Sequence, residues 1–268
     1  MIAKPPLAEK CRACHYVRMK KNTYITVGIV VLAVIIGTFL MITRKTGIVE
    51  ITVPKAETVV FIDNKRKVTT SIDNEVVTLS VSAKEHSVLV ANEKYFPWLK
   101  EIEVKENTST PLRPFLVAKS PDVTVITDTD PERGKINSLV VAARLPRSTT
   151  KKQSQDGTVS IWAEGETIFA EWNGSESAMP LFFCPGGTCD KRLTVITLKS
   201  PIRNLDFYKD RNDVVIFAAE EGILALELDK TKVQNLQPIY KGNEPMFYKN
   251  SDQALFVKDG QALGRISF

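Results

Sequence analysis

The chain is poor in the residues that most often carry catalysis or bind metals. It has 2 histidines and 4 cysteines among 268 residues, and it lacks the Gly-x-Ser-x-Gly turn that presents a catalytic serine in many hydrolases. A Ser-His-Asp triad would have to use His86, which lies in a short apolar run. We therefore predict a protein that is not an enzyme and needs no cofactor.

Charge is absent from one long stretch, between Asn22 and Thr43. A helix of this length would extend about 33 Å, close to the ~30 Å hydrocarbon core of a membrane. A buried core helix would keep a polar stripe, and a cleaved signal peptide would have a shorter apolar run. The sequence predicts one uncleaved transmembrane helix over residues 22–43.

Acidic residues are scarce before this stretch, where Glu9 stands among six basic residues: Lys4, Lys10, Arg12, Arg18, Lys20 and Lys21. Residues 44–268 are balanced in charge, so the net charge of +5 belongs to the tail. The positive-inside rule then places residues 1–21 in the cytoplasm, against membrane lipid, and the rest outside it. The neutral outer part gives no support for nucleic acid as a partner.

The tail brings two cysteines and a histidine together at Cys11, Cys14 and His15. Cys-x-x-Cys-His is the pattern that attaches c-type haem, but that attachment takes place outside the cytoplasm in prokaryotes. A zinc ion shared by two tails and palmitoylation of Cys14 stay open. Two spans can pack through Ala33 and Gly37, which would give a homo-oligomer. The alternative function is thus a redox or zinc-linked membrane protein.

Beyond the span, short runs such as GIVEITV, TVVFID and HSVLVAN alternate apolar and polar residues. Such alternation in Val- and Ile-rich runs predicts half-buried strands. Five runs of this kind within residues 44–118 predict a small antiparallel β-sandwich.

The region 47–107 resembles a PEGA domain. The segment EHSVLVANEKYFPWLKEIEV carries the family's histidine strand and its Tyr-x-Pro-Trp turn, at His86, Tyr95, Pro97 and Trp98. The namesake turn departs from the family, since Pro54 is followed by Lys-Ala-Glu. The resemblance implies an extracytoplasmic β-sandwich beside a membrane anchor, without catalysis.

Residues 119–268 form the second predicted domain. It follows a Pro-rich stretch, residues 110–121, that predicts a semi-extended linker or an edge segment,. Its runs, NSLVVAARL among them, predict strands,. Two similar units begin near Phe207 and Phe247, and a spacing of about 40 residues is that of a β-propeller blade. With GTVSIWAEGETIFAEW as a third blade, we expect an open propeller-like array or a ring completed by another subunit.

Four smaller features complete the candidates. Cys184 and Cys189 enclose Pro-Gly-Gly-Thr, which predicts a disulfide worth about 2 kcal/mol. The acidic segment 128–134 fits an Asx-type turn better than a calcium loop. The sequons at Asn107 and Asn173 leave glycosylation open.

Trp162 and Trp172 bracket one predicted hairpin at an even spacing. We expect them on one face, as core packing or, less favoured, as a stacking surface for glycan or peptide. The whole sequence predicts a single-pass cell-envelope protein with a non-catalytic binding or scaffolding role outside the cytoplasm. Its expected partners are membrane lipid and a cell-envelope protein or polysaccharide.

Overall fold

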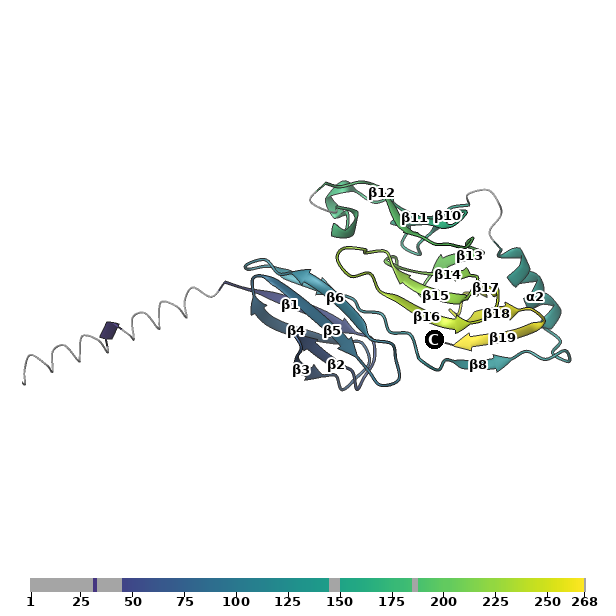
Figure 1. Ribbon diagram of the computed structural model, residues 1–268, viewed down its shortest axis with the longest axis horizontal. Coiled ribbons are helices and arrows are strands. Elements are labelled where there is room, and N and C mark those ends of the chain that lie inside the picture. The colour runs from purple at the N-terminus through teal and green to yellow at the C-terminus, as the bar shows by residue number, and fades with distance from the viewer. Residues whose placement is uncertain (1–30, 33–44, 145–149, 185–187, 268) are drawn as a thin grey trace, which may run out of the picture. The chain divides into compact units, whose positions relative to one another are not determined.

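The computed structural model describes residues 31–32, 45–144, 150–184 and 188–267. These residues are mostly β and form five small sheets, together with helix α2 (Arg133–Ala142) (Figure 1). Val31 and Leu32 are helical and exposed. The tail 1–21 and the rest of the predicted span lie outside the described residues. Among the residues that are described, no helix is long and apolar enough to cross a membrane.

Two sheets make up the first region. The three-stranded sheet has the order β4-β1-β7 and the four-stranded sheet the order β3-β2-β5-β6. Their strands are β1 (Thr46–Val53), β2 (Val59–Ile62), β3 (Lys65–Thr69), β4 (Glu75–Ser82), β5 (Glu85–Ala91), β6 (Trp98–Glu103) and β7 (Ser109–Leu112). The predicted alternation holds in β1, where Val49, Ile51 and Val53 are fully buried.

The antiparallel expectation is wrong for one pair of strands. β1 and β7 run parallel, with Ile48 opposite Ser109. They are parallel because β7 returns to β1 from the other sheet rather than through a hairpin. At this crossing a Cβ on Gly47 would lie 2.4 Å from the carbonyl oxygen of Lys105. Only glycine fits there, so the glycine at the start of β1 sets how closely the returning chain passes.

Three four-stranded antiparallel sheets make up the rest. Of these three, the one that we call the first sheet contains β9 (Lys152–Gln153), β10 (Val159–Glu164), β11 (Thr167–Trp172) and β12 (Arg192–Thr197). The middle sheet contains β13 (Asn204–Phe207), β14 (Val214–Ala219), β15 (Gly222–Glu227) and β16 (Leu236–Lys241). The third sheet contains β17 (Met246–Lys249), β18 (Leu255–Asp259), β19 (Ala262–Ser267) and β8 (Asp122–Val125).

The middle sheet is buried on both of its faces. Val215 and Phe217 pack into one apolar cluster with the first sheet. Ile216 and Ala218 face the other way, into a cluster shared with the third sheet and with the first region. The alternation of β14 is thus apolar on both sides, as expected of a strand between two layers.

Helix α2 corrects the strand predicted at NSLVVAARL. Ile136 and Val140 are buried four residues apart, whereas Val141 is 48% exposed, and this spacing belongs to a helix face. Its buried side packs with Leu263 of the third sheet. Before the helix, Asp130 Oδ1 accepts the N–H of Glu132 at 2.8 Å. The β-branched residues favoured a strand, but packing against the third sheet outweighs that local preference.

The Pro-rich stretch is only partly what the sequence predicts. Pro111 lies in β7 at the edge of its sheet, as expected of an edge segment. The following residues are no free linker, because Phe115, Leu116 and Val117 are each less than 7% exposed. They enter the apolar cluster that the first region shares with the middle and third sheets.

Candidate functional site

The tail cluster Cys11, Cys14 and His15 lies outside the described residues. In the part of the chain that the structure describes, no three His, Cys, Asp or Glu side chains are grouped so that they could hold a metal ion.

His86 lies in a Ser-His-Asp arrangement that residue spacing does not reveal. Its Nδ1 is 2.8 Å from Asp63 Oδ2, and its Nε2 is 3.3 Å from Ser82 Oγ. A shorter contact of 2.8 Å joins Nε2 to the carbonyl oxygen of Ser82. Because Nε2–H donates to this carbonyl, the lone pair that a general base needs does not face the serine hydroxyl.

The surroundings of His86 fit a bracing role. Its side chain is 4% exposed, and it joins the turn between β4 and β5, which connects the two sheets, to the β2–β3 turn. Burial acts to raise the pKa of Asp63, but hydrogen bonds from His86 and from the Ser87 N–H outweigh it and lower that pKa. The trio therefore holds two turns together.

The acidic segment 128–134 forms the turn that starts α2. Asp128 pairs with Arg133 at 3.0 Å, and Arg133 also donates to the carbonyl oxygens of Ile126 and Gln261. The carboxylates of Asp128 and Asp130 thus bind a neighbouring arginine and a backbone N–H of the turn. They are not arranged as the oxygen ligands of a calcium loop.

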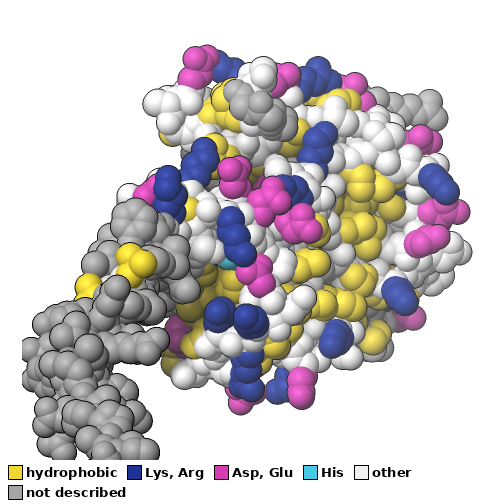
Figure 2. Space-filling view, turned by 60° about the vertical axis from the view of Figure 1, so that its left-hand side comes forward, with side chains coloured by type: hydrophobic (Ala, Val, Ile, Leu, Met, Phe, Trp, Pro, Cys, Tyr) yellow, Lys and Arg dark blue, Asp and Glu magenta, His cyan; other side chains and the backbone are white. Residues whose placement is uncertain are grey.

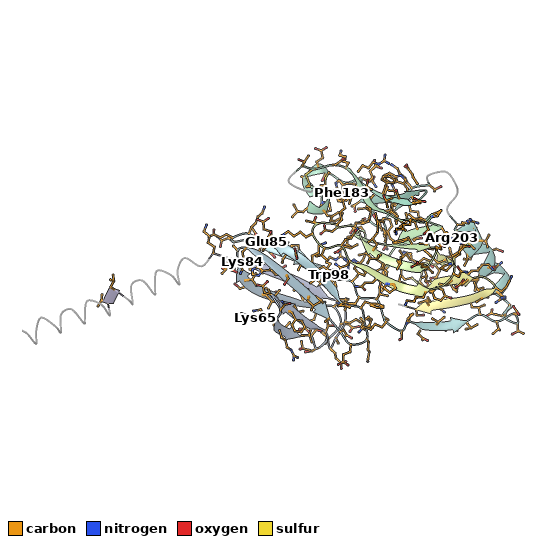
Figure 3. All side chains as sticks on the ribbon, in the orientation of Figure 1. Lys65, Lys84, Glu85, Trp98, Phe183 and Arg203 are labelled. Atoms are coloured by element: carbon orange, nitrogen blue, oxygen red, sulfur yellow. A yellow bond between two sulfur atoms is a disulfide. The ribbon has the colours of Figure 1, made fainter. Side chains whose placement is uncertain are left out.

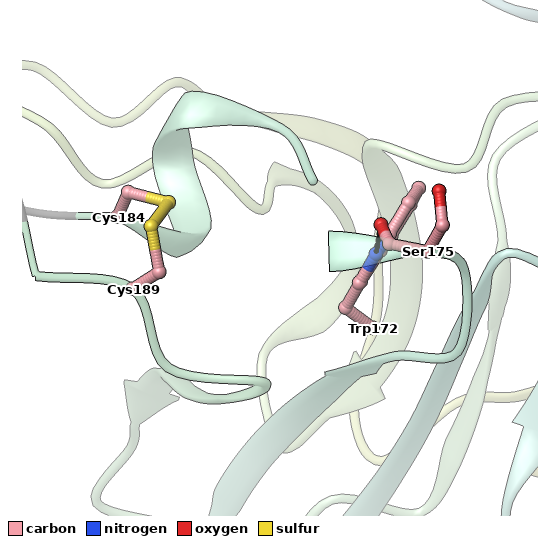
Figure 4. Close-up of a disulfide and its surroundings, with 4 residues drawn as sticks. All are labelled: Trp172, Ser175, Cys184 and Cys189. Atoms are coloured by element: carbon pink, nitrogen blue, oxygen red, sulfur yellow. Dashed lines mark hydrogen bonds between the residues drawn. A yellow bond between two sulfur atoms is a disulfide. The ribbon is translucent and has the colours of Figure 1, made fainter. Parts of the chain in front are cut away.

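The predicted cysteine pair braces an insertion between β11 and β12 that contains η1 (Glu176–Ala178) and η2 (Leu181–Phe183). Cys184 and Cys189 form a disulfide with their Cα atoms 3.8 Å apart (Figure 4). The insertion is anchored by Phe183, which is 1% exposed and 6.2 Å from the Trp172 ring. Trp172 Nε1 donates to the carbonyl oxygen of Ser175 (Figure 4).

Trp162 and Trp172 lie on opposite faces of the first sheet, so the expectation of one shared face is wrong. Trp162 pairs with Phe169 across the hairpin, and Trp172 pairs with Val159. Paired residues share a face, and three residues along a strand reverse it. Residues at an even spacing share a face only when they lie on one strand. Here the strand pairing across the two-residue turn places residues on the same face when their spacing is odd.

The face that carries Trp162 is covered by charged side chains. Trp162 and Phe169 stack with their centroids 5.4 Å apart. Arg192 lies 5.0 Å from the Trp162 centroid, and Lys151 lies 4.6 Å from it. Their carboxylate partners are Glu164 and Glu171. Because these cations leave Trp162 only 3% exposed, the face offers no open aromatic platform to a glycan.

A buried charge cluster joins β6 to the end of β15. Lys100 Nζ lies 3.2 Å from Glu227 Oε2 and 2.9 Å from Asp229 Oδ2. It also donates to the carbonyl oxygen of Val233 at 3.0 Å. Burial raises the pKa of Glu227, an effect that the Lys100 ammonium and the amide of Asn235 oppose. A lysine this buried keeps its charge only with such partners.

Two buried amides complete this contact, which we call the junction (Lys100, Glu227, Asp229, Asn235 and Gln237). Asn235 accepts from the N–H of Leu99 at 3.0 Å and donates to its carbonyl oxygen at 2.9 Å. Gln237 accepts from the N–H of Val117 and donates to the carbonyl oxygen of Pro97. The two amides pair with backbone as a neighbouring strand would. Trp98, beside these contacts in β6, is 1% exposed (Figure 3).

The two sequons differ in their surroundings. Asn107 is exposed at a turn with φ of 56°. Asn173 Nδ2 donates to the carbonyl oxygen of Gly157 and to Ser160 Oγ, contacts that a glycan on this nitrogen would remove. On the face shown in Figure 2, basic and acidic side chains of the described residues are interspersed, unlike the basic stripe of a nucleic-acid-binding face.

The comparisons with known proteins identify no family. No protein-family model and no curated protein matches the chain. Among solved structures, it is similar to a protein of unknown function from Bacteroides fragilis that is described as membrane-associated. The identity is 11%, the match covers 82% of this chain and 97% of that chain, and the TM-score is 0.22. At this TM-score the likeness carries no functional argument.

Proposed function

We propose that the chain is a membrane-anchored envelope protein with a non-catalytic binding or scaffolding role outside the cytoplasm. In this proposal the first region is a PEGA-like sandwich, and the remaining sheets are three blades of an open propeller-like array. A cell-envelope protein or polysaccharide is the expected partner.

The junction is the observation that supports this proposal best. Asn235 and Gln237 take backbone partners on β6 and on the segment after β7, and Lys100 reaches Glu227 at a site less than 10% exposed on both sides. Polar contacts of this kind work only at one relative placement of the two parts. A fixed joint suits a module that holds a binding surface at a set distance from a membrane.

The topology is tested on the full-length chain in intact cells. With the tail inside, protease added outside should digest residues 44–268 and spare residues 1–21 until the membrane is opened. A matched variant in which the six basic residues of the tail become Gln should lose this single orientation. Protection of the C-terminal domains in intact cells would contradict the proposal.

Binding is tested by cosedimentation of the detergent-solubilised protein with insoluble cell-wall polysaccharide and with washed envelope membranes. Retention by either fraction is expected. The matched variant is Asn235→Ala with Gln237→Ala, which should weaken the fixed joint while each part stays folded. Recovery of the unaltered protein in the supernatant with both fractions would count against an envelope partner.

A further inference from the structure

Three turns at one end of the first region are tied to one another and to the start of β1. A Cβ on Gly47 would lie 2.6 Å from the side chain of Val104, and the N–H of Val104 donates to the carbonyl oxygen of Lys84 at 3.0 Å. His86, just after the β4–β5 turn, lies 2.8 Å from Asp63 of the β2–β3 turn. The β2–β3, β4–β5 and β6–β7 turns therefore share the end at which the chain enters the fold, and we call it the entry end (Figure 3).

Four exposed basic side chains gather on the β2–β3 and β4–β5 side of the entry end. We call them the basic patch: Lys65, Arg66, Lys67 and Lys84. Across the described residues, none of the four forms an ion pair with a carboxylate. Glu85 pairs with Lys232, and Glu101 and Glu103 act on that same lysine. The β6–β7 turn adds one lysine and one glutamate, which balance. Four positive charges against the carboxylate of Asp63 leave the basic patch at +3.

The chain allows little distance between the entry end and the predicted span. If residues 22–43 cross the membrane, Gly47 follows the span by four residues. The fold is already fixed there, because the N–H of Ile48 donates to the carbonyl oxygen of Thr108 at 2.9 Å. Four extended residues reach about 14 Å. The headgroup layer is about 5–7 Å thick, and charges act over about 8 Å at physiological ionic strength. Lipid phosphates are thus within reach of this end.

We propose that the basic patch rests on anionic phospholipid headgroups at the outer surface of the membrane. Lys65, Arg66 and Lys67 belong to β3, which is an edge strand of its sheet, so phosphates can approach all three. Arg66 holds Thr69 Oγ1 at 2.6 Å through one nitrogen and has two more for phosphate oxygens. The inference rests on the proposed function, because it needs the anchor and the outward orientation of residues 44–268.

Such a contact would fix how the first region stands on the membrane. A four-residue connection alone leaves the region free to rotate and tilt about the anchor. Several phosphate contacts on one side of the entry end remove that freedom. The junction then passes the same orientation on to the middle sheet.

The test measures how fast single lysines are acetylated in the full-length protein in lipid nanodiscs. The discs contain phosphatidylcholine alone or an equal mixture with phosphatidylglycerol, and neither lipid has an amine that consumes the reagent. Mass spectrometry should show Lys65, Lys67 and Lys84 reacting about threefold more slowly in the anionic discs. The difference should vanish at about 1 M salt, where charges act over only ~3 Å. Lys199, exposed and outside the first region, should react alike in both.

Charge-reversed variants locate the contact. With Lys65→Glu and Lys67→Glu together, Lys84 should lose its protection in anionic discs. The matched control reverses two exposed lysines outside the first region, Lys135→Glu with Lys199→Glu, and should keep that protection. Thermal melting shows that each variant is folded.

The outcomes separate this inference from the proposed function. Equal lysine reactivity in the two kinds of disc, for protein that has entered both, overturns the inference and leaves the proposed function standing. A chain that enters neither kind of disc contradicts the anchor and therefore both. Protection that needs added soluble polyphosphate, and does not arise in anionic discs, would assign the basic patch to a soluble polyanion and overturn the inference.

Discussion

The middle sheet and the first sheet are built from similar hairpins but face different surroundings. In the middle sheet every residue of β14 is buried, because apolar clusters lie on both sides. The first sheet packs one face on the middle sheet, and its other face carries the Trp162–Phe169 stack under charged side chains. A sheet at the end of an array can thus cover its last aromatic residues with Lys and Arg side chains.

The largest expected loss of stability comes from a substitution in the middle sheet. Phe217→Ala removes a ring that is fully buried and should lower the free energy of unfolding by ~3–5 kcal/mol. Phe169→Ala, on the outer face of the first sheet, should cost about 1–2 kcal/mol because its ring is only partly buried,. Urea unfolding of both variants measures the difference. Equal losses would show that the two faces are equally well packed.

The next effect concerns the junction, which involves the middle sheet and not the first. Lys100→Met leaves Glu227 buried without its cation and should cost about 3 kcal/mol. Lys100→Met combined with Glu227→Leu should recover most of that loss, since the double variant leaves no buried charge unpaired in this pair. A double-mutant cycle by urea unfolding gives the coupling. Additive losses would mean that the two charges do not interact.

The first sheet has a covalent staple that the middle sheet lacks among the described residues. Replacing Cys184 and Cys189 together by serine opens the disulfide-closed loop and should cost about 2 kcal/mol in the chain-entropy estimate. Adding a reductant to the unaltered protein should lower its melting temperature about as much as the double substitution does. The melting temperature of the double variant should not change with the reductant. A reductant effect on the double variant would trace the loss to other groups.

The smallest effect is a pH dependence where the first and middle sheets meet. A hydrogen bond from Ser154 is the main cause that lowers the pKa of Asp156 to about 2, and bonds from Thr158 and Asn212 add to it. Because this pKa is lower in the folded protein, the ionised carboxylate stabilises the fold above the unfolded-state pKa of about 4. This stabilisation is lost as the pH falls toward 2. Between pH 4 and pH 2, the melting temperature of the Asp156→Asn variant should therefore fall less than that of the unaltered protein. Parallel curves would contradict this assignment.

The parts of the fold that follow from local pattern were predictable, and those that depend on distant partners were not. Alternation in β1 and the Gly turns at Gly165 and Gly260, where φ is 61° and 57°, can be recognised from neighbours alone. The helix at 133–142 could not, because β-branched residues suggest a strand unless the third sheet is known to cover Ile136 and Val140. The face of Trp162 could not be predicted from its spacing to Trp172, because it depends on the length of the turn that joins β10 to β11.

The candidate site shows the same limit. The oxygen partners of His86 come from two separate turns, and no spacing motif joins them. Asn235 and Gln237 alternate within and before β16 as polar residues do on an exposed strand, although both are buried. Only their backbone partners on β6 and after β7 give them a role.

The pairing of β8 with β19 has a consequence for how the chain folds. Val123 of β8 pairs with Ile266 of β19. The third sheet is therefore completed by two strands that lie far apart in the sequence (Figure 1). During synthesis β8 and α2 emerge long before the surface they need, and pairings so distant in sequence form slowly. We expect the third sheet to be the last to assemble, and a chain that stops before Ala262 to expose β8 as an unpaired edge open to aggregation.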